Sequence, residues 1–251
     1  MTKPDEWAVV AGATGAIGSQ IVEQLLDRGL GVVAVARSAA GLQELGADRA
    51  NVVLRPADIS SDESVVVVRD AIPGTVRMVV NSAAAPMAGT IGDVAPSAVV
   101  GAIEVKVNGT LRLVRAADDH LTVDSRIVAI GGNLGYDPIP EAATAGVGNA
   151  ALANAIRQLS RALGPRGVTC HVVAPGPVWT DRLRALLRDA AQSRGVSEDV
   201  VVGEFRERSP IGHLVEIGEV VWAVDLLLDP RARSLAGGTL LLDAGQRTAI
   251  P

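Results

Sequence analysis

The feature that most constrains the fold is a set of spaced glycines close to the beginning of the chain. Three apolar residues at positions 9–11 lead into Gly12, Gly15 and Gly18, and a helical pattern begins there. Gly12 permits a tight turn, Gly15 lets a phosphate approach the backbone, and Gly18 lets the helix pack closely against the strand. The free N–H groups at the helix N-terminus then face the phosphate. A strand, a turn and a helix in this order predict a binding site for the pyrophosphate of a dinucleotide.

The rest of the chain alternates short β-branched runs with longer helical patterns. The runs are apolar throughout, as is typical of parallel strands that are covered on both faces. They occupy residues 8–11, 31–36, 51–54, 76–81, 126–130, 168–174 and 239–243. We therefore expect an α/β fold over residues 1–251, namely a single Rossmann-type doubly wound domain with a seven-stranded parallel sheet flanked by helices.

One segment, at about residues 180–209, departs from this alternation. It is richer in Arg, Asp and Glu and has the pattern of one or two amphipathic helices. Ligands of doubly wound folds bind beyond the carboxyl ends of the strands, where this segment begins. It is therefore predicted to be a helical lid or substrate insertion, and a plain surface excursion is the alternative.

Composition limits the classes of partner. The net charge of -5 provides no basic field for nucleic acid or for an anionic membrane. The first apolar run is too short for a signal peptide or a membrane span, and the single cysteine, Cys170, fits a reducing compartment. The three histidines are scattered without the spacing of metal ligands. We expect a cytoplasmic protein with no metal site and no nucleic-acid or membrane partner.

The end of the second predicted strand bears on the choice of dinucleotide. In NAD-binding folds an acidic residue about 20 residues beyond the turn accepts a hydrogen bond from the ribose 2′-hydroxyl. This chain has Arg37 and Ser38 at that place. Both can hold a 2′-phosphate, and no carboxylate is there to repel it. The pattern favours NADP(H) over NAD(H), with an ordinary solvated arginine as the alternative reading of Arg37.

These features, with several short motifs, resemble the short-chain dehydrogenase/reductase family over nearly the whole chain. The motifs lie at residues 57–59, 81–84, 107–109, 175–180 and 238–245. The resemblance implies that Asp58 contacts the adenine, that Val178 and Thr180 flank the nicotinamide carboxamide, and that Asn108 is the helix asparagine of the family's catalytic tetrad. The full set of cofactor-binding residues implied is Gly12, Thr14, Gly15, Ile17, Gly18, Arg37, Ser38, Asp58, Ile59, Asn81, Ala83, Asn149, Pro175, Gly176, Val178 and Thr180.

The other three residues of that tetrad are missing. Family members use a Ser, a Tyr that protonates the carbonyl oxygen, and a Lys four residues after the Tyr. With the helix registered from its C-terminal side, these positions hold Gly132, Ala145 and Asn149, and no Tyr-x-x-x-Lys occurs in the chain. The only lysines are Lys3 and Lys106. We expect both to lie away from this helix, and the Lys106 side chain to point away from the face of Asn108.

Two polar residues are candidates for part of the missing chemistry. Tyr136, the only tyrosine, lies in the loop after the fifth predicted strand and can donate to a substrate oxygen. Without a nearby cation its pKa stays near 10, which is high for a general acid, and a packing tyrosine is the alternative. Asn149 can bond the nicotinamide ribose as a neutral substitute for the lysine, or it can be a helix-surface asparagine.

Three hypotheses for the function follow. The first is an NADP(H)-dependent oxidoreductase that transfers a hydride to an already electrophilic acceptor, such as an enone, quinone, flavin or iminium. The second is a catalytically silent nucleotide-binding relative that acts as a sensor or subunit. The third, a non-redox reaction, is disfavoured because the dehalogenase-like variants need Ser, Tyr and Arg at positions that lack them here.

Loss of a general acid lowers a rate by about 10²–10⁴, so simple ketones are not expected as substrates. The segment at residues 175–180 matches the family's nicotinamide-facing motif and favours the first hypothesis over the second. The expected partners are a small-molecule substrate or none. The resemblance further implies a homo-dimer or tetramer formed through the helices that carry Asn108 and Asn149.

Overall fold

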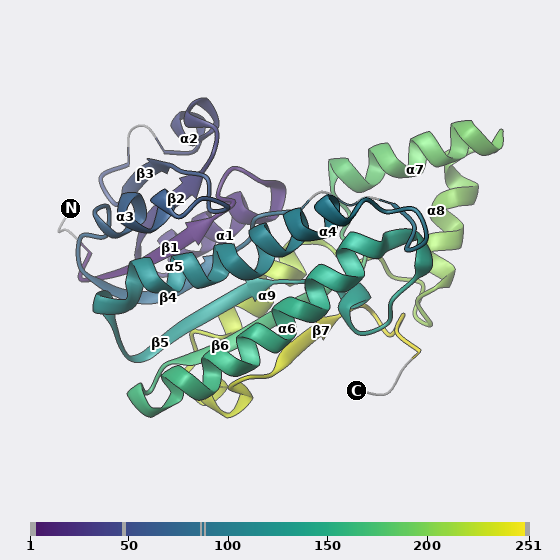
Figure 1. Ribbon diagram of the computed structural model, residues 1–251. Helices are drawn as coiled ribbons and strands as arrows, with labels where there is room; N and C mark the ends of the chain where they lie inside the picture. The colour runs from purple at the N-terminus through teal and green to yellow at the C-terminus, as the bar shows by residue number, and fades with distance from the viewer. Residues whose placement is uncertain (1–3, 47–48, 86, 88, 249–251) are drawn as a thin grey trace.

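The computed structural model describes residues 4–46, 49–85, 87 and 89–248 (Figure 1). Lys3 lies outside these ranges. Within them, seven strands form one parallel sheet in the order β3-β2-β1-β4-β5-β6-β7. The strands are β1 (Glu6–Ala11), β2 (Gly31–Ala36), β3 (Val52–Pro56), β4 (Thr75–Asn81), β5 (Leu121–Ile130), β6 (Thr169–Pro175) and β7 (Thr239–Leu242). The predicted doubly wound sheet is confirmed. Its order reverses at β1, which leaves a crevice between the carboxyl ends of β1 and β4.

Helices cover both faces of the sheet (Figure 1). One face carries α1 (Ala16–Asp27), α2 (Ala39–Gly46) and α9 (Ile217–Leu226). The other carries α3 (Glu63–Arg69), α5 (Gly109–Ala117) and α6 (Ala143–Leu163). A π-helical turn, η1 (Glu104–Asn108), joins α4 (Pro96–Ile103) to α5. The short 3-10 helices are η2 (Asp118–His120), η3 (Asn133–Gly135), η4 (Pro140–Ala142), η5 (Gly164–Arg166) and η6 (Pro230–Leu235).

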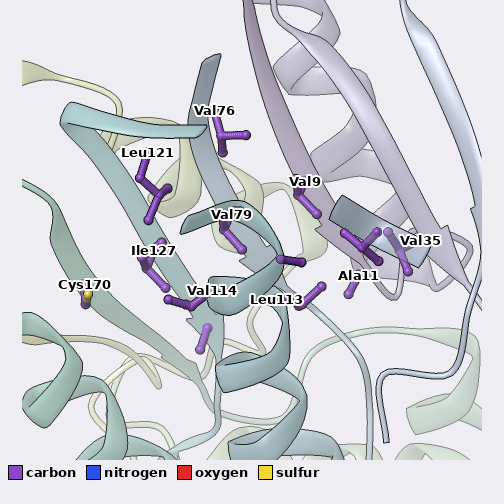
Figure 2. Close-up of a cluster of buried hydrophobic side chains, with 14 of the residues drawn as sticks. Val9, Ala11, Val35, Val76, Val79, Leu113, Val114, Leu121, Ile127 and Cys170 are labelled. Atoms are coloured by element: carbon purple, nitrogen blue, oxygen red, sulfur yellow. The ribbon is translucent and has the colours of Figure 1, made fainter. Parts of the chain in front are cut away.

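The core lies on the two faces of the sheet. Successive strand residues point to opposite faces, so a strand between two helical layers is apolar at every position. Figure 2 shows one layer, in which Leu113 and Val114 of α5 pack over Val79 and Ile127. Ile21 and Leu25 of α1 are fully buried on the opposite face. Burial of a side chain of this size contributes about 1.5–3 kcal/mol, which fixes α1 and α5 against the strands whose ends form the site.

The fifth strand begins earlier than the sequence predicts. It starts at Leu121 rather than at Arg126, and the β4–β5 register shifts between Val76 and Met78. Asp124 has a φ of 69°, a left-handed conformation that is rare for a residue with a side chain. The continuous apolar pattern therefore starts only after this irregularity. For that reason the sequence did not predict the first residues of the strand.

The segment at residues 180–209 forms α7 (Asp181–Arg194) and α8 (Glu198–Glu207), which stand apart at one end of the sheet (Figure 1). Leu187, Ala191 and Val201 form a small core of their own between the two helices. The segment is thus helical, and its action as a lid stays a prediction. No helix within the described ranges is both long enough and apolar enough to cross a membrane.

Candidate active site at the carboxyl end of the sheet

The turn after β1 is packed too tightly to accept side chains. Gly12 has a φ of 75°, and a Cβ atom placed on it would lie 2.7 Å from the Ala83 nitrogen. A Cβ atom on Gly18 would overlap the Gly12 carbonyl oxygen. Gly15 is less crowded, since its nearest such neighbour is the Gly12 oxygen at 3.3 Å. The turn therefore presses against the loop after β4 and leaves its outer side open, which is the geometry that a pyrophosphate cradle requires.

The N-terminus of α1 supplies the positive end of this cradle. Gly15 is the N-cap, and in α1, which is described in full, no side chain caps the helix and no acidic residue occurs in the first turn. The first N–H groups of a helix have no partner inside the helix and carry a partial positive charge. A phosphate at this end is therefore stabilised by backbone donors.

The end of β2 gathers the residues predicted to select the cofactor. The Ser38 hydroxyl accepts a hydrogen bond from the Gly41 nitrogen at 3.0 Å, and a Cβ atom on Gly41 would lie 3.2 Å from Thr14. Arg37 is exposed beside them. The hydroxyl and amide of Ser60 donate to Asp58, and these bonds, with the charge of Arg37, hold the pKa of Asp58 below its ordinary value. Asp58 is thus a fixed, ionised acceptor at the edge of the corner formed by Thr14, Arg37 and Ser38.

Asn81, which was predicted to bind the cofactor, holds three segments together. Its oxygen accepts from the Ala83 nitrogen at 3.0 Å, and its amide donates to the Thr110 hydroxyl at 2.9 Å and to the Val105 carbonyl at 3.1 Å. The side chain is only 2% exposed. Asn81 therefore fixes η1 and the start of α5 against the end of β4. Nearby Ile59 is buried against Gly109, where a Cβ atom would lie 2.7 Å from the Ile59 side chain.

A cavity of about 590 Å³ opens beyond the ends of β4, β5 and β6. Its walls come from the loops after these strands, from η1, from the first half of α6, and from α7 and α8. The predicted cofactor residues that line it are Ile17, Asn149, Pro175, Gly176, Val178 and Thr180. Val178 is held by a bridge to Val215, and the Thr180 hydroxyl caps α7 by accepting from the Leu183 nitrogen at 3.3 Å. The segment at residues 180–209, predicted to be a lid, therefore begins directly at the cavity wall.

The structure places Asn108 and Lys106 differently from the sequence expectation. The Asn108 amide donates to Glu104 at 2.7 Å, and Asn108 does not line the cavity. Lys106 does line it, and its Nζ donates to the Ile130 carbonyl at 2.8 Å. The expectation that Lys106 lies away from α6 is therefore wrong, because it shares the cavity with Asn149. The two side chains on η1 do point in different directions, but the one that faces the cavity is Lys106.

The pKa of the Lys106 ammonium group is unusually low for a lysine. Burial lowers its pKa to about 8, and repulsion by Arg182 of α7 acts in the same direction. Among the described residues, no carboxylate forms an ion pair with its ammonium group. Since the ordinary pKa of lysine is near 10.4, this ammonium gives up its proton at much lower pH than a surface lysine does.

Lys106 shares the cavity with the three positions that the sequence analysis assigned to the family's Ser, Tyr and Lys. Gly132, Ala145 and Asn149 all line the cavity. A Cβ atom on Gly132 would lie 2.8 Å from the Asn149 amide nitrogen, so that amide occupies the space beside Gly132. Gly132 and Asn149 are therefore neighbours in the structure, and their correspondence to the family's Ser and Lys stays a prediction. No hydroxyl group stands at either Gly132 or Ala145.

Tyr136 lies against the sheet rather than in the cavity. Its hydroxyl is hydrogen-bonded to the Thr239 hydroxyl of β7, and its ring packs on the core that includes Leu152. It is not among the cavity-lining residues. The structure therefore gives Tyr136 the packing role that was the alternative at the sequence level.

Cys170 and His171 face opposite sides of β6, as neighbours on a strand do. Cys170 belongs to the core shown in Figure 2, and burial raises its pKa to about 12. Burial lowers the pKa of His171 to about 4. In the part of the chain that the structure describes, no group of three or more His, Cys, Asp or Glu side chains is arranged to hold a metal ion.

Comparison with known proteins gives consistent matches. A family model described as Enoyl-(Acyl carrier protein) reductase matches residues 12–247. The 3-oxoacyl-(acyl-carrier-protein) reductase FabG of Escherichia coli (strain K12) is 31% identical over 244 residues, which cover 95% of this chain and 96% of FabG.

Solved structures resemble the whole chain. A variant of the actinorhodin polyketide ketoreductase, solved with NADPH, has a TM-score of 0.87 at 26% identity and covers 99% of both chains. A blue fluorescent protein from a metagenomic library, in complex with NADPH, has a TM-score of 0.83 at 27% identity. That match covers 97% of this chain and 98% of the other.

Proposed function

The chain belongs to the short-chain dehydrogenase/reductase family, and we propose that it is an NADP(H)-binding oxidoreductase that acts on an already electrophilic acceptor. The acceptor is an enone, a quinone, a flavin or an iminium. When bound, reduced NADP supplies the hydride. The rest of the proposal concerns what the residues of this chain do around it.

The glycine turn fits the pyrophosphate of the cofactor. Gly12 and Gly18 leave the backbone bare where a side chain would collide with it, and α1 presents its uncapped N-terminus to the same place. Arg37 and Ser38 would hold the 2′-phosphate of NADP(H), because an arginine pairs strongly with phosphate and no acidic residue stands at the end of β2. Two solved relatives of 26% and 27% identity contain NADPH.

One observation carries the choice of acceptor. A single cavity combines the segment at residues 175–180, which fits the nicotinamide, with Gly132 and Ala145, which offer no hydroxyl for a carbonyl oxygen. The absence of a general acid at the usual place lowers the rate for a simple ketone by about 10²–10⁴. An acceptor that is already polarised loses less, because orientation against the nicotinamide supplies most of its acceleration. The family model that matches is described as an enoyl reductase, and an enoyl group is a conjugated acceptor.

The first experiment measures the melting temperature of the protein with NADPH, with NADH and with neither. We expect NADPH to raise it more than NADH does at equal concentration, because only NADPH carries the 2′-phosphate. A panel of enone, quinone, flavin, iminium and saturated ketone is then tested with NADPH. Turnover of a conjugated acceptor supports the proposal. Stabilisation by NADPH with silence toward every acceptor supports the second candidate, a nucleotide-binding sensor or subunit.

A further inference from the structure

We propose that Lys106 binds the oxygen of the acceptor and gives it a proton, so that the substrate is a neutral conjugated carbonyl compound, an enone or a quinone, and not a cationic iminium. This inference rests on the proposed function and narrows its acceptor. It assigns the role of the missing acid to a residue of η1, whereas the family's Tyr and Lys positions lie on α6.

The placement of Lys106 is the first support. Its side chain lines the same cavity as Gly132, Ala145 and Asn149, which are the positions without an acid. A lysine ammonium has three N–H donors, and within the described residues one of them is used, at 2.8 Å to the Ile130 carbonyl. This bond fixes the nitrogen at the end of β5. The remaining donors are available to a ligand oxygen in the cavity.

The charges around Lys106 are the second support. Besides Lys106, the charged groups that line the cavity are Asp137, Glu141, Arg182 and Arg208. Asp137 accepts from Thr248 at 2.9 Å, and the Arg208 guanidinium stacks on Phe205 at 4.1 Å. In the described part of the chain neither Asp137 nor Glu141 forms an ion pair with Lys106.

The acid on η1 itself, Glu104, is bound by Arg112 at 3.0 Å. Within the described residues, Lys106 therefore has Arg182 as its charged neighbour and no carboxylate paired with it. A cationic ligand is repelled by such a pair of like charges, whereas an oxygen that becomes anionic is stabilised.

The chemistry balances without a further reagent. Reduced NADP, when bound, would supply the hydride for a C–H bond at the terminal carbon of the conjugated system. The C=C electron pair of the acceptor would then shift, and its carbonyl oxygen would become an enolate oxygen. An N–H bond of Lys106 breaks, an O–H bond forms on that oxygen, and Lys106 is left as a neutral amine. The amine then takes a proton from water. A pKa of about 8 suits this exchange near neutral pH.

Conjugation also explains why an acid outside α6 can serve. In a simple ketone the carbon that accepts the hydride carries the oxygen that needs the proton. In an enone or a quinone these two atoms lie at different places in the molecule. Lys106 on η1 can therefore give a proton to the oxygen although Ala145 has no acidic group.

The first test compares wild-type protein with Lys106→Met and Lys106→Arg, all saturated with NADPH. We expect Lys106→Met to lower kcat for an enone by about 100-fold or more, with NADPH affinity within about twofold of wild type. Lys106→Arg keeps the positive charge, so KM stays close to wild type while kcat falls, because arginine does not release its proton. Equal kcat in all three proteins would overturn the proposal.

The pH profile separates a proton donor from a merely structural cation. In wild type, kcat should fall as the pH rises through about 8, because the ammonium loses its proton, and Lys106→Met should lack this fall. Arg182→Met should move the fall to higher pH, because it removes a repulsion that lowers the pKa of Lys106. The matched control is Arg188→Met on the same helix, since Arg188 pairs with Glu198 at 3.2 Å and does not line the cavity. An unchanged profile in Lys106→Met contradicts the proposal.

A binding measurement tests, without any turnover, whether Lys106 stabilises an anionic oxygen in the cavity. A coloured nitrophenol is titrated against protein saturated with oxidised NADP, and the absorbance reports whether it is bound as the phenolate. Wild type should lower the pKa of the bound phenol, and Lys106→Met should not. Equal phenolate binding by both proteins, or faster turnover of a cationic iminium than of an enone, would overturn the inference. If NADPH fails to stabilise the protein, the proposed function itself fails. The same nitrophenol titration, repeated on both proteins without nucleotide, then still decides whether Lys106 stabilises a bound anionic oxygen.

Discussion

The cofactor side and the reacting side of the candidate site differ in what their glycines do. On the cofactor side, Gly12 and Gly18 are required, because backbone atoms stand where a Cβ atom would be. On the reacting side, Gly132 has an extended backbone with a φ of -175°, which any residue can adopt, and the Asn149 side chain fills the space beside it. On the cofactor side, backbone atoms therefore exclude any side chain at these glycines. On the reacting side, the space beside Gly132 is limited chiefly by the Asn149 side chain. Substitutions are therefore expected to be tolerated more readily on the reacting side than in the turn that faces the cofactor.

The largest expected effect is on the cofactor side, in Gly18→Ala. The added methyl group collides with the Gly12 carbonyl. This overpacking against the backbone is expected to make the free energy of NADPH binding less favourable by about 3 kcal/mol, which is a loss of roughly 100-fold in affinity. Calorimetric titration with NADPH measures it. Gly101→Ala is the matched control, because a Cβ atom there meets nothing within 4 Å. Equal NADPH binding by both variants would show that the turn is not the cradle.

Arg37→Glu tests the selection of the cofactor at the end of β2. A charge-assisted hydrogen bond to phosphate contributes about 1.5–3 kcal/mol, so NADPH affinity should fall about 10- to 100-fold while NADH affinity stays close to wild type. The melting temperature at graded concentrations of each nucleotide reports both affinities. A parallel loss for NADPH and NADH would mean that Arg37 does not touch the 2′-phosphate.

Gly132→Ser tests the packing on the reacting side. Because the backbone accepts serine, the strain comes from the Asn149 amide, and we expect the variant to lose about 1–3 kcal/mol of unfolding free energy. Adding Asn149→Ala should restore part of that loss, so the two changes are not additive. Urea unfolding of both single variants and the double variant measures the coupling. Additive effects would place the two side chains apart.

The smallest expected effect belongs to Tyr136→Phe. Removal of the hydroxyl breaks the hydrogen bond to Thr239, which should lower the free energy of unfolding by about 0.5–1.5 kcal/mol. Turnover of an enone should change by less than about twofold, since Tyr136 lies outside the cavity. A large loss of kcat with little loss of stability would return Tyr136 to the reacting groups.

Sequence reasoning succeeded where a local pattern determines the structure. The seven apolar runs predicted the strands, and the glycine spacing predicted the turn, because period and sterics act over a few residues. It was wrong where a side-chain direction depends on distant contacts. The π-helical turn at η1, held by Asn81 from β4, brings Lys106 to the cavity and leaves Asn108 on Glu104. Lys106 is the only lysine besides Lys3 in the sequence, and this scarcity was the available signal.

The most direct test of the account compares two acceptors that differ in one double bond, a cyclic enone and its saturated ketone, with NADPH and the wild-type protein. The account predicts that kcat/KM for the enone exceeds that for the ketone by about 100-fold or more, because Gly132 and Ala145 in the cavity wall offer no hydroxyl group to a ketone oxygen. Equal rates, or faster reduction of the ketone, would contradict it.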